Sequence, residues 1–149
     1  MSNADNILFK VENGVAFLTL NRPAKMNAIT AAMGGQIAAY AKQIDTDDNI
    51  KVLVIDGAGE RAFSAGSDVN ALDDLGTVWD SRNRADYDRD YIAPLLGLRK
   101  PAIAAIDGYC LGGGLEVAIC CDIRVATYRS SFGAPEVQRG WHAGSGNTS

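Results

Sequence analysis

The sequence has few of the residues on which metal centres and disulfide frameworks depend. It contains one histidine, His142, and three cysteines in 149 residues, and their spacing resembles no zinc site. Cys120 and Cys121 are adjacent, and together with Cys110 they lie in an apolar stretch. This favours free thiols in a reducing compartment over disulfides. We therefore expect a cytoplasmic protein without a metal site.

The sequence also lacks a basic surplus and long hydrophobic runs. Its formal net charge is −4, from 18 acidic and 14 basic residues, which argues against nucleic acid as a partner. Glycine, aspartate and arginine interrupt the apolar runs before they reach the roughly 20 residues of a membrane-spanning helix. Residues 1–6 have neither the basic nor the apolar region of a signal peptide. A small anionic ligand is still compatible with this charge, because local backbone dipoles can bind it.

The first third of the chain carries clear local signals. Residues 7–12 and 15–20 are predicted strands, joined by Asn13 and Gly14 in a type I′ hairpin turn. Thr30 is the predicted N-cap of a helix that runs to about residue 45. The apolar face of this helix would contain Met33, Ile37, Tyr40, Ala41 and Ile44.

Further along, strand patterns alternate with helix patterns. Residues 52–55 and 102–106 are predicted strands covered on both faces, and each leads into a glycine-bearing loop. The first of these loops covers residues 57–68. Residues 73–90 are polar and carry both charge signs, which predicts a mobile surface segment before a helix that ends near Leu98.

The last part continues the alternation, with a short helix predicted at 115–121 and a strand at 123–126. Crossovers of this length imply a mainly parallel α/β core, in one domain that spans residues 1–149.

Three consecutive glycines, residues 112–114, stand just before Glu116 at the start of the short helix. Backbone N–H groups exposed there, with the helix dipole behind them, suit an anion or a developing oxyanion. Alternatively, the glycines only form a tight turn and Glu116 is an ordinary helix-start carboxylate. The segment matches neither a P-loop nor a dinucleotide-binding fingerprint.

Two further loops contain candidate polar residues. Glu136 follows a predicted strand, where it is either a solvated surface residue or an acid/base partner of Glu116. Ser67 and Asp68 follow another strand, where an ordinary turn is the simplest interpretation. Ser67 as a hydrolytic nucleophile with His142 as its base is disfavoured, because the nucleophile-elbow motif is missing.

Taken in order, four segments resemble the crotonase (enoyl-CoA hydratase/isomerase) superfamily. They are residues 20–28, 63–68, 100–122 and 132–136. The resemblance covers essentially the whole chain. It implies a crotonase-like spiral core of repeated β-β-α units, an acyl-CoA substrate, and a homo-oligomer, either a trimer or a dimer of trimers. Family members are considerably longer, so it also implies that their C-terminal helical part is absent from these 149 residues.

The resemblance also implies roles for individual residues. The backbone N–H groups of Ser67 and Gly113 would bind the thioester oxygen. Glu116 and Glu136 would add water across the double bond, and Glu136 would deliver the proton to the α-carbon. Coenzyme A would be part of the substrate, with no separate cofactor and no metal. The implied acyl-CoA contacts are Lys25, Ala28, Arg61, Ala65, Asp68 and Val69.

The sequence departs from the family pattern at several positions. Ser67 replaces the usual alanine, and Asn70 stands where many hydratases have lysine. After Glu136, Trp141 and His142 interrupt the usual glycine-rich pattern. Two alternatives to a hydratase therefore stay open. One is another acyl-CoA isomerase or dehydratase on this scaffold, such as a carnitinyl-CoA-type dehydratase. The other is an inactive truncated homologue with only a binding or oligomerisation role.

Overall fold

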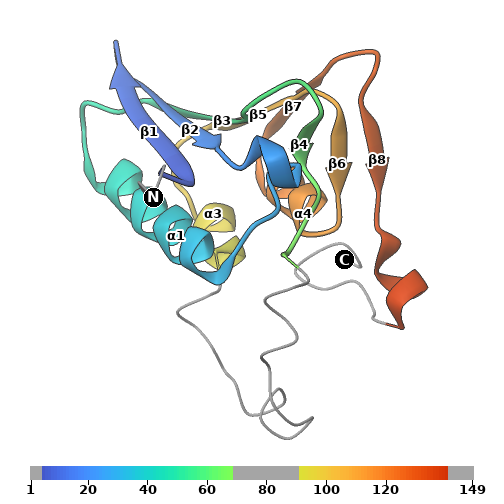
Figure 1. The fold of residues 1–149 in the computed structure, drawn as a ribbon. Helices are drawn as coiled ribbons and strands as arrows, with labels where there is room; N and C mark the ends of the chain where they lie inside the picture. The colour runs from blue at the N-terminus through green and yellow to red at the C-terminus, as the bar shows by residue number, and fades with distance from the viewer. Residues whose placement is uncertain (1–4, 69–90, 141–149) are drawn as a thin grey trace, which may run out of the picture.

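The structure, a computed structural model, describes residues 5–68 and 91–140 (Figure 1). A five-stranded sheet has the order β1-β2-β3-β5-β7, and a three-stranded sheet has the order β4-β6-β8. The strands of the large sheet are β1 Ile7–Glu12, β2 Val15–Leu20, β3 Val52–Gly57, β5 Ala102–Ile106 and β7 Ile123–Ala126. Those of the small sheet are β4 Ala62–Ser64, β6 Tyr109–Leu111 and β8 Ser131–Gly133.

The predicted hairpin and the mainly parallel core are confirmed. β1 and β2 pair antiparallel, and the turn residues Asn13 and Gly14 both have positive φ, 51° and 82°. This is the conformation that a type I′ turn requires. All other strand pairs are parallel, from β2 with β3 to β6 with β8.

Helix α1, Ala31–Thr46, begins and ends close to its predicted limits. The hydroxyl of Thr30 accepts a hydrogen bond from the backbone N–H of Met33 at 3.3 Å, as expected of an N-cap. Four of the five predicted face residues are buried, whereas Tyr40 is half-buried and stacks on Phe9 with ring centroids 4.2 Å apart. Figure 1 shows α1, α3 and α4 on the same side of the large sheet.

The chain repeats one pattern, in which a strand of the large sheet is followed by a short strand of the small sheet and then by a helix. β3 and β4 precede α3, Ile92–Leu96, and β5 and β6 precede α4, Gly113–Cys120. β7 and β8 precede the 3-10 helix η5, Pro135–Arg139. The expected spiral of β-β-α units is therefore present.

Two of these short strands differ from the prediction. Residues 57–68 were expected to form a loop, but they contain β4, and β6 interrupts the loop expected after β5. A three-residue strand is too short to show an alternating pattern in sequence, because pairing with a neighbour is what defines it. The predicted mobile segment at residues 73–90 lies outside the described residues.

The expectation that β3 and β5 are covered on both faces is wrong. Leu53 and Ile55 of β3 are fully buried, whereas Val52 and Val54 on the opposite face are half-buried. β5 alternates in the same way. The helices of the described residues cover one face of the large sheet only (Figure 1). An apolar run therefore showed that the residues form a strand, but not how many of its faces are covered.

All three cysteines are free thiols, as predicted. Burial raises the pKa of both Cys110 and Cys121 to about 12, so these two thiols are protonated at neutral pH. In residues 5–68 and 91–140 no helix has the length and apolar content needed to cross a bilayer.

Candidate active site

The loop after β4 lies directly against the start of α4, and glycines make this approach possible. A Cβ on Gly66, whose φ is +92°, would lie 2.9 Å from the carbonyl oxygen of Leu111 and 3.0 Å from the backbone nitrogen of Gly113. A Cβ on Gly114 would lie 2.6 Å from Cβ of Ser64. Side chains at either glycine would therefore push the two segments apart.

A short parallel pairing between Ile29 and Ser67 holds the loop after β4 in place. The N–H of Ile29 donates to the carbonyl of Gly66 at 2.8 Å, and the N–H of Asp68 donates to the carbonyl of Ile29 at 2.9 Å. In a parallel pair this pattern leaves the N–H of the residue between, Ser67, directed away from the partner. It therefore faces the other side of the loop, where α4 begins.

The structure thus brings together Ser67 and Gly113, the two residues predicted to bind the thioester oxygen. A Cβ on Gly113 would lie 3.4 Å from the backbone nitrogen of Ser67. Gly113 is the first residue of α4, so its N–H has no acceptor within the helix. In the part of the chain that the structure describes, the backbone N–H of Ser67 donates no hydrogen bond. Both N–H groups are available to one small acceptor.

Asn27 and Arg22 anchor the segment that leads to Ile29, the residue that pairs with the loop after β4. The fully buried Asn27 donates from its side chain to the carbonyls of Ala58 and Ala62, at 2.9 and 2.7 Å, and accepts from the N–H of Arg22. The Arg22 guanidinium donates to Asp68 at 2.8 Å. The predicted ligand contact Asp68 is therefore part of an ion pair within the protein.

Glu116 lies in the first turn of α4 and is 8% exposed. It is the only buried charged residue among those whose side chains the structure describes. Its N–H donates to the carbonyl of Gly112 at 3.0 Å, so it belongs to the turn that also presents Gly113. Because a buried carboxylate is costly without compensating contacts, its burial is unusual for a residue with only a surface role.

Glu136 approaches the same turn from η5. The N–H of Gly112 donates to the carbonyl of Gly133 at 2.9 Å, which ties β6 to β8 just before this helix. A Cβ on Gly112 would lie 3.2 Å from Oε1 of Glu136, while Oε2 is buried and has no hydrogen-bond partner among the described residues. The two predicted glutamates are therefore both neighbours of Gly112.

The remaining predicted ligand contacts are more scattered. Lys25 and Arg61 are exposed, on the turn η1, Pro23–Lys25, and on the loop before β4. These two segments are neighbours, because a Cβ on Gly59 would lie 3.0 Å from Cβ of Pro23. Ala28 and Ala65 are half-buried beside the loop. Val69, Asn70, Trp141 and His142 lie outside the described residues.

No sequence motif points to Tyr91, the residue before α3. Its hydroxyl oxygen lies 2.9 Å from the position that a Cβ on Gly113 would occupy. An aromatic residue before a short apolar helix is normally part of the core, and this ring is indeed packed against the core. Only the fold brings the start of α3 to the start of α4, because α3 packs against α4.

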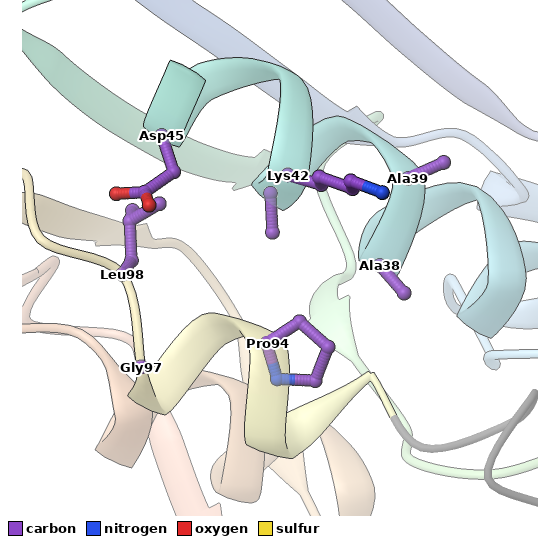
Figure 2. A pocket seen from close by; sticks show the side chains of 8 residues that line it. Ala38, Ala39, Lys42, Asp45, Pro94, Gly97 and Leu98 are labelled. Carbon is purple, nitrogen blue, oxygen red and sulfur yellow. The ribbon is translucent and has the colours of Figure 1, made fainter.

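A separate pocket of about 480 Å³ lies between α1 and α3 (Figure 2). It is lined by Ala38, Ala39, Ala41, Lys42, Asp45, Pro94, Gly97 and Leu98. Asp45 is already held by the Arg99 side chain at 2.9 Å, and none of the predicted site residues lines this pocket. Across residues 5–68 and 91–140, no group of three or more histidine, cysteine, aspartate or glutamate side chains could hold a metal ion.

Comparison with known proteins places these features in a family context. The model of the enoyl-CoA hydratase/isomerase family matches residues 15–149. The chain is 35% identical to a short-chain-enoyl-CoA hydratase of Clostridium acetobutylicum over 144 residues, which are 97% of this chain and 55% of that protein. It is 34% identical to a crotonyl-CoA hydratase of Syntrophomonas wolfei, with the same coverage.

A solved structure has a similar fold. The crystal structure of an enoyl-CoA hydratase/carnithine racemase from Magnetospirillum magneticum superposes with a TM-score of 0.87 at 34% identity. The superposition covers 95% of this chain and 54% of that one. The fold is therefore that of these proteins, and the chain spans about half the length of the relatives that it matches.

Proposed function

Because the chain belongs to the enoyl-CoA hydratase/isomerase family, we propose that the protein is an enoyl-CoA hydratase, which adds water across the 2,3 double bond of a 2-enoyl-CoA thioester. The observation that carries this proposal is the meeting of four residues at the start of α4. Ser67 and Gly113 present two backbone N–H groups there, and Glu116 and Glu136 flank the same turn.

The two N–H groups would stabilise charge that develops during the reaction. Addition of water to the β-carbon turns the thioester into an enolate, so its carbonyl oxygen becomes negative. Donors already in place for that oxygen need no reorganisation when the charge appears, and each can contribute roughly 3–4 kcal/mol by analogy with other oxyanion sites. The close contact of Gly66 with Gly113 supports this role, because it fixes the distance between the two donors.

The two glutamates would hold the water and move its protons. The water is held by Glu116 and Glu136, and its oxygen bonds to the β-carbon as one of its protons passes to Glu136. Glu136 then gives that proton to the α-carbon, so both carboxylates end as they began. Water is thereby added as a whole, with no change in oxidation state. The buried Oε2 of Glu136, which has no partner among the described residues, is an acceptor suited to such a water.

The substrate would bring coenzyme A with it, so the reaction calls for no separate cofactor. The exposed cations Lys25 and Arg61 lie on neighbouring segments, which suits contact with the phosphates of coenzyme A. A homo-oligomer, such as a trimer, is part of the same proposal.

The test uses the purified protein with crotonyl-CoA. Hydration removes the conjugated double bond, so the absorbance of the enoyl thioester should fall with time. Glu116→Gln and Glu136→Gln should each reduce kcat by roughly 10²- to 10⁴-fold, the usual contribution of a general acid or base, while coenzyme A still binds. Glu12→Gln is the matched control, since Glu12 is exposed on β1 and pairs with Lys10 at the surface.

These measurements distinguish a hydratase from an isomerase and from a homologue that only binds acyl-CoA. Near-normal turnover in either site variant would show that the two-carboxylate assignment is wrong. Movement of the double bond without water uptake would favour an isomerase. Binding without any turnover by the complete protein would favour the homologue that only binds.

A further inference from the structure

Three polar atoms lie close to Gly113, on the side where a side chain would project. From the position that a Cβ on Gly113 would occupy, the hydroxyl oxygen of Tyr91 lies 2.9 Å away, Oγ of Ser67 lies 3.2 Å away, and the backbone nitrogen of Ser67 lies 3.4 Å away. Two of these atoms belong to the loop after β4, whereas the third comes from the start of α3. A side chain at position 113 would crowd the Tyr91 hydroxyl.

The Tyr91 hydroxyl is held at this point by the core. Its ring is partly buried and packs against the hydrophobic cluster, and α3 packs against α4. The backbone carbonyl of Tyr91 accepts from the N–H of Leu95 at 3.4 Å, so the residue is also tied to the first turn of α3. Two torsions place a tyrosine ring, so packing of the ring fixes the position of the hydroxyl oxygen, while the O–H can rotate toward an acceptor.

We propose that the Tyr91 hydroxyl is a third hydrogen-bond donor to the thioester oxygen, beside the N–H groups of Ser67 and Gly113. This inference rests on the proposed function, and it adds a side-chain group to a site otherwise built from backbone. A hydroxyl has one donor and two acceptor positions, so Tyr91 can donate to the substrate while its oxygen accepts a bond from another group. A donor aimed at an oxygen that becomes negative acts more strongly on the enolate than on the thioester, so it raises kcat.

A purely structural role makes a different prediction. If Tyr91 only fills space beside Gly113, its ring matters and its hydroxyl does not. Tyr91→Phe keeps the ring and removes only the hydroxyl oxygen, so it separates the two roles. Tyr128→Phe is the matched control, because Tyr128 is fully exposed after β7 and has no part in the site.

The experiment measures polarisation of the bound carbonyl directly. The probe is an enoyl-CoA with a dimethylamino-cinnamoyl acyl group, whose absorption moves to longer wavelength when donors polarise the thioester oxygen. The purified wild-type protein and the Tyr128→Phe variant should bind it with the same shift. Tyr91→Phe should bind it with a smaller shift and should lose roughly tenfold in kcat with crotonyl-CoA, about the contribution of one hydrogen bond. Its Tm should stay within a few degrees of wild type.

The results that overturn the proposal are distinct from those that overturn the function. An unchanged spectral shift in Tyr91→Phe overturns the third donor, whether turnover is kept or is lost together with Tm. If wild-type protein neither binds the probe nor hydrates crotonyl-CoA, the proposed hydratase itself is wrong, and the third donor with it.

Discussion

The interior strands β2 and β3 and the edge strand β7 of the large sheet all contain apolar residues, but they are covered very differently. In β2 and β3 the residues that face α1, including Leu18 and Leu53, are at most 1% exposed. In β7, which forms an edge of the sheet (Figure 1), all four residues are exposed, with Ile123 at 52% and Val125 at 60%. An apolar strand therefore contributes to stability only where the fold covers its side chains.

The candidate site has residues in both the covered and the exposed part of the fold. Ser67, Gly113 and Glu116 rest on the covered part, where the loop after β4 and the start of α4 interlock. Glu136 is joined to the exposed part, next to Phe132 and Val137, which are 50% and 77% exposed. One carboxylate is thus fixed by the core, while the other depends on the contact of β8 with β6 and on its neighbour Gly112.

The comparison is tested most strongly by truncating one side chain in the interior strand β3 and one in the edge strand β7. Leu53→Ala should lower the free energy of unfolding by about 2–5 kcal/mol, because it leaves a cavity under α1. Val125→Ala should change it by less than about 0.5 kcal/mol, because the side chain is already mostly in water. Urea unfolding followed by circular dichroism measures both. Equal effects would mean that β7 is covered in solution.

An intermediate effect is expected from adding a methyl group between β4 and α4. Gly114→Ala should lower the free energy of unfolding by about 1–3 kcal/mol, because the new Cβ would lie 2.6 Å from Cβ of Ser64. Gly133→Ala on β8 is the matched control, since among the described residues its Cβ would meet just the end of the Leu111 side chain, at 3.3 Å. A thermal melt of each variant compares them. If Gly133→Ala proved the more harmful, the contact of β8 with β6 would be more tightly packed than that of β4 with α4.

The smallest effect concerns the exposed ion pair after β5. Hydrogen bonds from Arg129, and then from Thr127, lower the pKa of Asp107 to about 2 from the ordinary value of 3.8. Because the folded pKa is lower than the unfolded one, this pair stabilises the fold above about pH 4 and ceases to do so as the pH falls toward 2. Exposure and salt screening keep the contribution small. In Arg129→Gln, NMR titration should show the pKa of Asp107 closer to its ordinary value; an unchanged pKa would contradict the pairing.

Much of the local structure could be predicted because its causes are local. The two positive φ values of Asn13 and Gly14, and the cap that Thr30 gives α1, follow from the residues themselves. β4 and β6 could not be found in the same way, since three residues form a strand only when a neighbour pairs with them. The site residues Ser67, Gly113 and both glutamates were named from motifs, whereas Tyr91 has no motif.

The amino-acid sequence alone was enough to predict the hairpin with its turn, the helix cap and the longer strands, because each depends on residues a few positions apart. Only the tertiary structure decided that Ser67 and Tyr91 meet at Gly113, and that one face of the large sheet is covered while β7 is exposed. These features depend on contacts between segments that are far apart in the chain. Their energies come from packing and close approach, which a local pattern of residues does not record.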